Sequence, residues 1–318
     1  MTWFGAGLDG PLVAVRAVHF AATSIPAGTL LFRAAVINPG ASTATPAVAG
    51  SCAEIRRLAA ISLAIAAATG ALWLLLVAAS ISGLSLTGAM TKDVLTTVVT
   101  DTRFGKVAAL RGGMATVLAM ALAGDRFAAA RGLGLAMAFG LTASIAWIGH
   151  AGSSGGALGS LQLIADAGHL VAAAVWLGGL VGLAMLLQAA RCERNGASFA
   201  RAREATMRFA SIGLITVAVL LSTGLANAWF LVGSWHGLVA SLYGRFLLLK
   251  LALLAATLAV AAVNRLVLTP RLQRSAGREP GFELLRQLKR NSLAEIGLLS
   301  LVYAVVGVLG SIAPALPS

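Results

Sequence analysis

Four histidines are the residues of this 318-residue chain best suited to bind a metal ion, because imidazole is the commonest metal ligand among side chains. His19 and His169 each fall about two helical turns inside a long apolar segment. His150 ends another such segment, and His236 follows a further one. Polar groups deep in apolar helices are costly unless they serve a site or find a partner. We therefore predict His19, His169 and His150 as metal ligands, with hydrogen bonding to a neighbouring helix as the alternative.

Charged residues precede both central histidines by three positions, so each shares a helix face with its histidine. Before His169 the residue is Asp166, whose carboxylate can accept the imidazole N–H and fix its tautomer, as the outer partners of metal-binding histidines usually do. Before His19 the residue is Arg16. The two histidines are thus predicted to lie in different electrostatic surroundings. An Arg16–Asp166 ion pair is the alternative that would neutralise both charges.

The composition predicts an all-α integral membrane protein. Charged residues make up 11% of the chain and the mean hydropathy is +0.89, whereas a soluble domain usually has about 25% charged residues. Eight apolar segments are each about 20 residues long, which is the length of helix that crosses a bilayer. They lie near 12–36, 58–80, 105–124, 131–151, 161–189, 207–233, 245–267 and 293–313. Asp9 and the absence of a positive charge before the first segment favour a retained helix over a cleaved signal peptide.

The net charge of +13 is unevenly placed, and this placement predicts the topology. Most Lys and Arg residues fall in alternate connections, after the first, third, fifth and seventh segments. By the positive-inside rule these connections face the cytoplasm, so both termini and the connections near 81–104, 152–160 and 234–244 lie outside. The basic residues then serve as topology signals and contacts to membrane lipids, and nucleic acid is not an expected partner. Cys52 and Cys192 fall in inside connections, where no structural disulfide is expected.

Matching motifs predict two parallel four-helix repeats, residues 1–154 and 155–318, because each half has an even number of crossings. The matches occur in the same order in each half. They are His19 with His169, Thr69-Gly70 with Thr223-Gly224, Phe104-Gly105-Lys106 with Tyr243-Gly244-Arg245, and Arg111 with Lys250. A duplicated bundle of this kind can build a site between its halves. Arg111 and Lys250 are predicted to anchor at the outer surface or to hold an anionic group such as a haem propionate. Glu295 and Asn264 are predicted to form a polar cluster on the inner side.

The second half resembles the copper resistance protein D family of bacterial inner-membrane proteins. The motifs that carry this resemblance are Asp166-x-x-His169, Trp176-x-Gly178-Gly179-Leu180, Thr223-Gly224, Tyr243-Gly244-Arg245-x-Leu247-x-x-Lys250, Asn264, Pro270 and Glu295. The resemblance implies a multi-pass protein of the bacterial plasma membrane that handles copper, moving it from periplasm to cytoplasm. It also implies a small periplasmic copper-binding partner.

Two functions follow from these observations. In the first, the outer-side histidines take a copper ion that passes between the halves towards Glu295. In the second, His19 and His169 clamp the iron of a haem b in a membrane cytochrome, and Arg111 or Lys250 binds the propionates. The chain has no phosphate-binding loop, His-Glu-x-x-His or Gly-x-Ser-x-Gly motif, so no catalytic residue is assigned. We therefore predict a transporter, with a membrane-bound oxidoreductase as the alternative.

Overall fold

The computed structural model describes residues 10–37, 46–149, 156–232, 234–275 and 279–312, and every regular element within them is helical. Eight of these helices are long and apolar enough to cross a membrane, which confirms the predicted class. They are α1 (Gly10–Phe32), α2 (Pro46–Ser82), α5 (Arg103–Ala123), α6 (Ala128–Ala143), α7 (Gly156–Glu193), α8 (Gly196–Val232), α10 (Leu242–Val263) and α12 (Glu279–Leu309). A π-helical turn, Arg33–Ile37, extends α1, and a 3-10 turn, Ser144–Trp147, extends α6.

Several helices are much longer than their apolar segments. α2, α7 and α8 contain 37, 38 and 37 residues, respectively. At a rise of about 1.5 Å per residue they are about 55 Å long, well beyond the roughly 30 Å of hydrocarbon. Hydropathy locates only the part of a helix that lies in the hydrocarbon. The polar turns at their ends, such as the one with Arg56 and Arg57 in α2, are therefore missed by an apolar pattern.

Two connections that we predicted as outer loops contain short helices. α3 (Leu86–Ala89) and α4 (Lys92–Asp101) follow α2, and α9 (Trp235–Ala240) follows α8. α9 begins at an N-cap serine, Ser234, whose hydroxyl accepts from the Gly237 N–H. The exposed His236 lies in this helix. Between α10 and α12 lie a π-helical turn (η4, Asn264–Leu268) and the short helix α11 (Thr269–Arg274).

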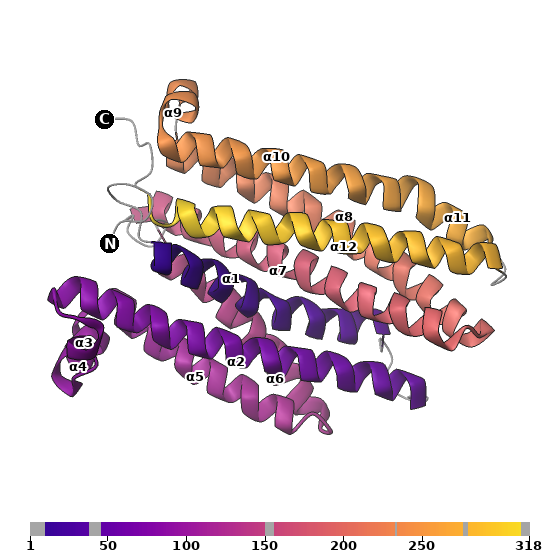
Figure 1. The fold of residues 1–318 in the computed structure, drawn as a ribbon, viewed down its shortest axis with the longest axis horizontal. Coiled ribbons are helices and arrows are strands. Elements are labelled where there is room, and N and C mark those ends of the chain that lie inside the picture. The colour runs from indigo at the N-terminus through magenta and orange to yellow at the C-terminus, as the bar shows by residue number, and fades with distance from the viewer. Residues whose placement is uncertain (1–9, 38–45, 150–155, 233, 276–278, 313–318) are drawn as a thin grey trace.

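α1 and α7 form the centre of the bundle, with α2, α5 and α6 on one side and α8, α10 and α12 on the other (Figure 1). In the most apolar windows of α1 and α7, 67% and 61% of the residues are buried, against 39% or less in the other six spans. The two central helices cross at Gly28 and Gly178. A methyl group on Gly28 would lie 2.1 Å from the Ala174 carbonyl oxygen, so only glycine allows this close approach.

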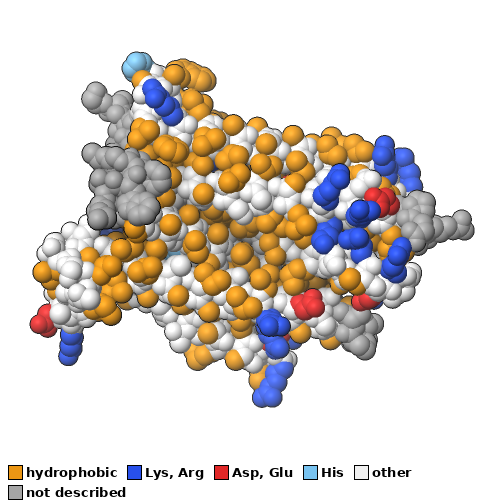
Figure 2. Space-filling view, viewed as in Figure 1, with side chains coloured by type: hydrophobic (Ala, Val, Ile, Leu, Met, Phe, Trp, Pro, Cys, Tyr) orange, Lys and Arg blue, Asp and Glu red, His pale blue; other side chains and the backbone are white. Residues whose placement is uncertain are grey.

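The two ends of the bundle differ in charge. The start of α1 and the end of α12 meet at one end, where Arg16 Nη1 donates to the Gly310 carbonyl. α3, α4 and α9 lie at this same end (Figure 1). On the face drawn in Figure 2, most Lys and Arg side chains gather at the opposite end, around α11. On this face, the end that carries α11 is thus rich in basic residues and the other end has few.

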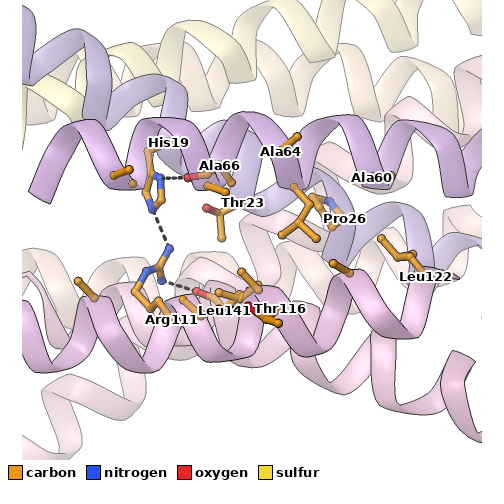
Figure 3. A pocket seen from close by; sticks show the side chains of 18 of the residues that line it. His19, Thr23, Pro26, Ala60, Ala64, Ala66, Arg111, Thr116, Leu122 and Leu141 are labelled. Carbon is orange, nitrogen blue, oxygen red and sulfur yellow. Dashed lines mark hydrogen bonds between the residues drawn. The ribbon is translucent and has the colours of Figure 1, made fainter. Parts of the chain in front are cut away.

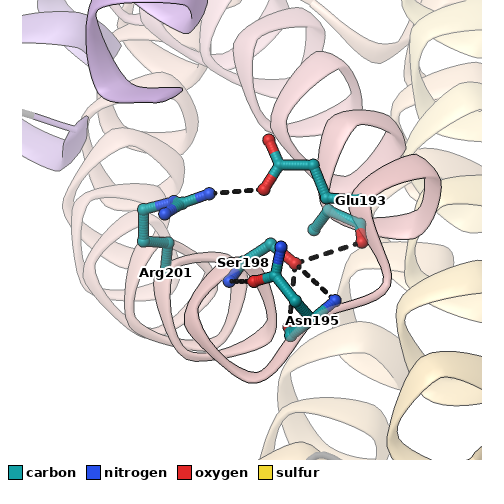
Figure 4. A network of polar contacts seen from close by, with 5 residues as sticks. Glu193, Asn195, Ser198 and Arg201 are labelled. Carbon is teal, nitrogen blue, oxygen red and sulfur yellow. Dashed lines mark hydrogen bonds and ion pairs between the residues drawn. The ribbon is translucent and has the colours of Figure 1, made fainter. Parts of the chain in front are cut away.

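The turn between α7 and α8 is fixed by a compact polar network (Figure 4). Asn195 caps α8, because its side-chain oxygen accepts from the Ser198 N–H at 2.8 Å. The Ser198 hydroxyl in return lies 3.3 Å from the Asn195 N–H. Glu193 of α7 pairs with Arg201 of α8 at 2.7 Å. These contacts hold the two longest neighbouring helices antiparallel outside the apolar region.

Asp125, in the turn between α5 and α6, pairs with Arg33 at the end of α1 through two contacts of 2.6 and 3.0 Å. Both side chains are largely buried, so replacing Asp125 with alanine would leave the guanidinium without its counterion. We expect the free energy of unfolding to fall by about 3–5 kcal/mol, which a lower melting temperature in detergent would show. Glu204→Ala is the control, since Glu204 pairs with Arg208 on the exposed surface of α8 and should cost about 1 kcal/mol or less. Equal melting temperatures for the two variants would contradict the expectation.

Candidate functional site

His19 is held in one tautomer by its neighbours (Figure 3). Its Nδ1 lies 3.0 Å from the Ala66 carbonyl oxygen and 3.1 Å from the Thr69 hydroxyl. Because a carbonyl can only accept, Nδ1 must carry the proton. Its Nε2 lies 2.8 Å from Nη2 of Arg111, which can only donate, so Nε2 must carry a lone pair. The imidazole is therefore neutral, and its lone pair on Nε2 accepts from a guanidinium.

His169 has a matching arrangement in the second half. Its Nδ1 lies 3.2 Å from the Thr223 hydroxyl, which itself donates to the Val219 carbonyl. Since that hydroxyl proton is already used, Thr223 accepts from Nδ1. In the neutral imidazole, Nε2 of His169 then carries the lone pair. This is the tautomer that a metal ion needs when it binds through Nε2.

Glycine follows threonine in both halves because a histidine ring packs on it. A methyl group on Gly70 would lie 3.1 Å from Cε1 of His19, and one on Gly224 would lie 3.2 Å from Cε1 of His169. Each Thr-Gly pair therefore supplies one acceptor and one flat surface to an imidazole. Each pair belongs to the second long helix of its half.

The second matching motif, which contains Gly105 and Gly244, also has a structural basis. A methyl group at Gly105 would lie 2.0 Å from the Val98 carbonyl oxygen, and one at Gly244 would lie 2.2 Å from that of Leu238. In each case a short helix, α4 or α9, packs against the start of a membrane-length helix. Hydroxyl caps precede both glycines by three residues, and they are Thr102 and Ser241. The motif thus fixes the starts of α5 and α10, which carry Arg111 and Lys250.

The electrostatic surroundings of the two histidines differ, as their sequences predict. In the second half, Asp166 accepts from Asn227 Nδ2 at 3.3 Å and interacts electrostatically with Lys250. Lys250 is also within electrostatic reach of His169. The second half therefore offers a carboxylate beside its ammonium group.

The first half has no such carboxylate in the region described. Arg16 stacks on Trp73 with its guanidinium carbon 5.0 Å from the ring centre, and it donates to the Gly310 carbonyl. No contact joins Arg16 to Asp166 among the described residues, so the ion pair considered as an alternative is not formed. His19 thus has the Arg111 guanidinium as its charged neighbour, with no carboxylate beside it among the described residues.

A cavity of about 1120 Å³ opens beside His19. α1, α2, α5 and α6 line it, and its outer part is formed by His19, Arg111, Trp73 and Phe104. Thr23 and Pro26 of α1 continue the wall inwards (Figure 3). His169 is not among the lining residues, and no described contact joins it to His19. Each histidine therefore faces α-helices of its own half.

Near the other end of the bundle, the structure brings Glu295 and Asn264 together. The Glu295 carboxyl group is 2% exposed and accepts from Asn264 Nδ2 at 2.7 Å and from Trp176 Nε1 at 3.3 Å. Asn291 in turn donates to Asn264 at 2.8 Å. Asn264 opens the π-helical turn η4, which turns its side chain towards α12. A polar cluster of α7, η4 and α12 side chains results.

The remaining predicted residues give a mixed result. His150 lies outside the described residues. No group of three or more His, Cys, Asp or Glu side chains suited to a metal ion occurs in the ranges that the structure covers. Cys52 and Cys192 are both free thiols, and both lie within the extended helices rather than in loops. Sequence reasoning missed Ser144 and Asn227, because a single polar residue in an apolar helix gives no signal until its partner is known.

Comparison with known proteins gives matches in both halves. Residues 7–160 match the family described as "Copper resistance protein D-like, N-terminal domain", and residues 203–309 match "Copper resistance protein D". The chain belongs to the copper resistance protein D family. No solved structure matches it.

Three curated proteins are similar to this chain in sequence. Copper resistance protein D of Pseudomonas syringae pv. tomato is 31% identical over 173 residues, which are 54% of this chain and 56% of that protein. Inner membrane protein YebZ of Escherichia coli K12 is 29% identical over 54% of this chain and 55% of its own length. Copper transport protein CutJ of Bacillus subtilis is 32% identical over 44% of this chain and 24% of its own length. The match spans about half of the first two relatives. With its eight membrane-length helices, the chain is a multi-pass protein of the bacterial inner membrane.

Proposed function

We propose that this protein carries copper across the inner membrane, from the periplasm to the cytoplasm. The names of the relatives from Pseudomonas and Bacillus support copper as the substrate. The observation that carries the proposal is the histidine geometry. Both imidazoles use Nδ1 to bond a neighbouring helix, so each Nε2 carries the lone pair. At His19 this lone pair accepts from Arg111, and at His169 it is the proposed ligand atom.

The proposed orientation has the end with α3, α4 and α9 facing the periplasm. The gathering of Lys and Arg side chains around α11 supports this, because basic residues favour the cytoplasmic side. The matching contacts of His19 and His169 support two parallel four-helix repeats, residues 1–154 and 155–318, with both termini outside. A small periplasmic copper-binding protein would deliver the ion to this outer end.

His169 is the proposed first ligand. Asp166 lies close enough to Lys250 to offset its charge, and Asn227 adds a neutral oxygen donor nearby. A cation arriving there gains a carboxylate and an imidazole lone pair. At His19 the same cation would have to displace Arg111, which is 2.8 Å from Nε2. Copper would reach His19 only after Arg111 had moved, and it would leave towards the Glu295–Asn264 cluster.

The haem alternative has less support from the geometry. A bis-histidine haem needs two imidazoles that face each other across one flat cavity. The cavity beside His19 is large, but His19 is its one lining imidazole among the described residues. His169 contacts α8 instead.

Copper uptake into vesicles tests the proposal. The purified protein is reconstituted with a copper-chelating dye inside, and Cu(I) is added outside. His169→Ala should abolish uptake, and Asp166→Asn should weaken copper binding about 10-fold or more, because Lys250 would lose its counterion. His236→Ala is the matched control, since His236 is exposed in α9. Unchanged uptake by a folded His169→Ala protein would refute the assignment, and a reduced Soret band with stoichiometric iron would favour the cytochrome.

A further inference from the structure

We propose that the cavity between α1, α2, α5 and α6 is a binding site for an anionic phospholipid, whose acidic head lies at Arg111 and whose acyl chain runs along the cleft. This site is separate from the proposed copper site at His169. It is inferred from the charge and shape of the cavity, so it does not rest on copper binding at His169, although a copper ion that passed to His19 would displace the same Arg111.

The charge of Arg111 is the first argument. Its side chain is 6% exposed, and its described partners are the Leu141 carbonyl, the Ser144 hydroxyl and His19 Nε2. All three are neutral, and no carboxylate pairs with it in the part of the chain described. A buried cation without a counterion is costly. An acidic group from outside the protein would remove that cost.

Two other buried or partly buried cations in this chain have such partners. Arg33 pairs with Asp125, and Lys250 interacts with Asp166. Arg111, like Arg16, has no such carboxylate partner among the described residues. Its contacts use two of its N–H groups on Nη1 and one on Nη2, so two of the five guanidinium N–H groups are left for a ligand.

The shape of the cavity is the second argument. On α2 the lining runs from Ala53 to Leu74, and on α5 it runs from Phe104 to Ala123. At about 1.5 Å per residue, each of these stretches is about 30 Å long, so the cleft has the length of the hydrocarbon region. Small side chains form most of its walls. They are Ala60, Ala64, Ala67 and Ala71 on α2, and Ala108, Gly112, Ala115 and Ala119 on α5.

Thr23 supplies a further polar group in this wall. It is 4% exposed, lines the cavity below His19, and its hydroxyl oxygen has no hydrogen-bond partner among the described atoms. Figure 3 shows it between His19 and Pro26, facing the space that separates α2 from α5. A hydroxyl and a guanidinium on one side of an apolar cleft suit a ligand with oxygen atoms at one end and a long chain at the other.

The bilayer itself supplies such a molecule. Leu72 on α2 and Leu110 on α5 are exposed on the bundle surface, where lipid chains would surround them. The inner end of the cleft carries Arg56, Arg57 and Glu54, so it is also polar. Arg111 lies at the outer end, within reach of headgroups of the outer leaflet by a long side chain. An acidic lipid of that leaflet can therefore enter sideways.

Quenching of Trp73 fluorescence is the direct test. Trp73 is 3% exposed and lines the cavity, so bromine on a bound acyl chain would quench it. The full-length protein in detergent is titrated with phosphatidylglycerol that carries brominated chains, and with phosphatidylcholine that carries the same chains. The signal of Trp73→Phe is subtracted to isolate this tryptophan. We expect half-maximal quenching at about a tenfold lower concentration of the anionic lipid.

Two matched pairs of variants locate the site. Arg111→Gln should remove the preference for phosphatidylglycerol, and Lys250→Gln should retain it. Gly112 lines the cleft, so Gly112→Leu should fill it and prevent quenching of Trp73 by the brominated lipid. Gly113→Leu should bind the brominated lipid as the parent protein does. A methyl group at either glycine would meet nothing within 4 Å, so both leucine variants should fold. Arg111→Lys keeps the charge and should keep the preference.

Four results would overturn the proposal, and the first three concern lipid preference, the cleft and its occupant. The first is equal quenching by both lipids, and the second is normal quenching of the folded Gly112→Leu protein. The third is a stoichiometric porphyrin in the purified protein that is lost in Gly112→Leu. The fourth is a brominated fatty acid that binds more tightly than the phospholipid, which would show that the cleft takes a free carboxylate instead.

Discussion

Replacing Gly28 with alanine is expected to prevent formation of a stable bundle. Gly28 of α1 faces Gly178 of α7, and a methyl group on Gly28 would lie 2.1 Å from the Ala174 carbonyl oxygen and 2.7 Å from the Gly178 Cα. Both contacts are to backbone, which cannot rotate away as a side chain can. α1 and α7 would have to separate along their length, and every contact of the central pair would weaken.

The expected loss of unfolding free energy exceeds the roughly 1–3 kcal/mol that is typical of an overpacked core. We expect Gly28→Ala, and Gly178→Ala for the same reason, to give little monodisperse protein in detergent and a melting temperature far below that of the parent. Gly113→Ala is the control. Gly113 lies in α5, and a methyl group added there would meet nothing within 4 Å. Because alanine has a higher helix propensity than glycine, this variant should be up to about 1 kcal/mol more stable. A Gly28→Ala protein as stable as Gly113→Ala would mean that α1 and α7 do not cross here.

Replacing Glu295 with leucine is expected to have the second largest effect. Two buried donors, Asn264 Nδ2 and Trp176 Nε1, would lose their acceptor. Each unsatisfied donor costs about 1–3 kcal/mol, so a total loss of about 2–6 kcal/mol is expected. Leucine adds apolar surface, which would offset only a part of this. Thermal unfolding in detergent measures the change.

Glu295→Gln separates the acceptor role from side-chain volume. Its amide oxygen can still accept from Asn264, but its N–H2 group would face the indole N–H, so an intermediate melting temperature is expected. Glu283→Ala is the surface control on the same helix, since Glu283 and Arg286 form an exposed pair worth about 1 kcal/mol or less. If Glu295→Leu melted like Glu283→Ala, the polar cluster would not stabilise the inner part of the bundle.

The two halves show how one set of contacts can serve different chemistry. In each half a histidine packs on a Thr-Gly pair, and a cation from the third long helix lies near it. The difference arises three residues before the histidine, where one half has Asp166 and the other has Arg16. Under the function proposed above, the carboxylate suits the second site to a cation, whereas the first site has Arg111 and no carboxylate among its described neighbours.

The sequence alone determined the fold class and the eight membrane helices. It also showed that His19 and Thr69-Gly70 in the first half are equivalent to His169 and Thr223-Gly224 in the second. Hydrophobicity and length decide whether a helix lies in a membrane, and both are properties of a short stretch of chain. The same patterns could not give the polar ends of α2, α7 and α8 or the short helices α3, α4 and α9. Those elements are stabilised by caps and packing, which an apolar pattern does not record.

Only the tertiary structure decided which groups meet. His19 and Arg111 are far apart in the chain, and nothing in either segment shows that a guanidinium would cover Nε2 rather than an ion. Likewise, the two histidines are equivalent in sequence, yet one lines a large cavity and the other does not. The direction in which a helix presents a side chain depends on its crossing with its neighbours, here on the contact of Gly28 with Gly178. That contact is a property of two helices together, so no single stretch of sequence contains it.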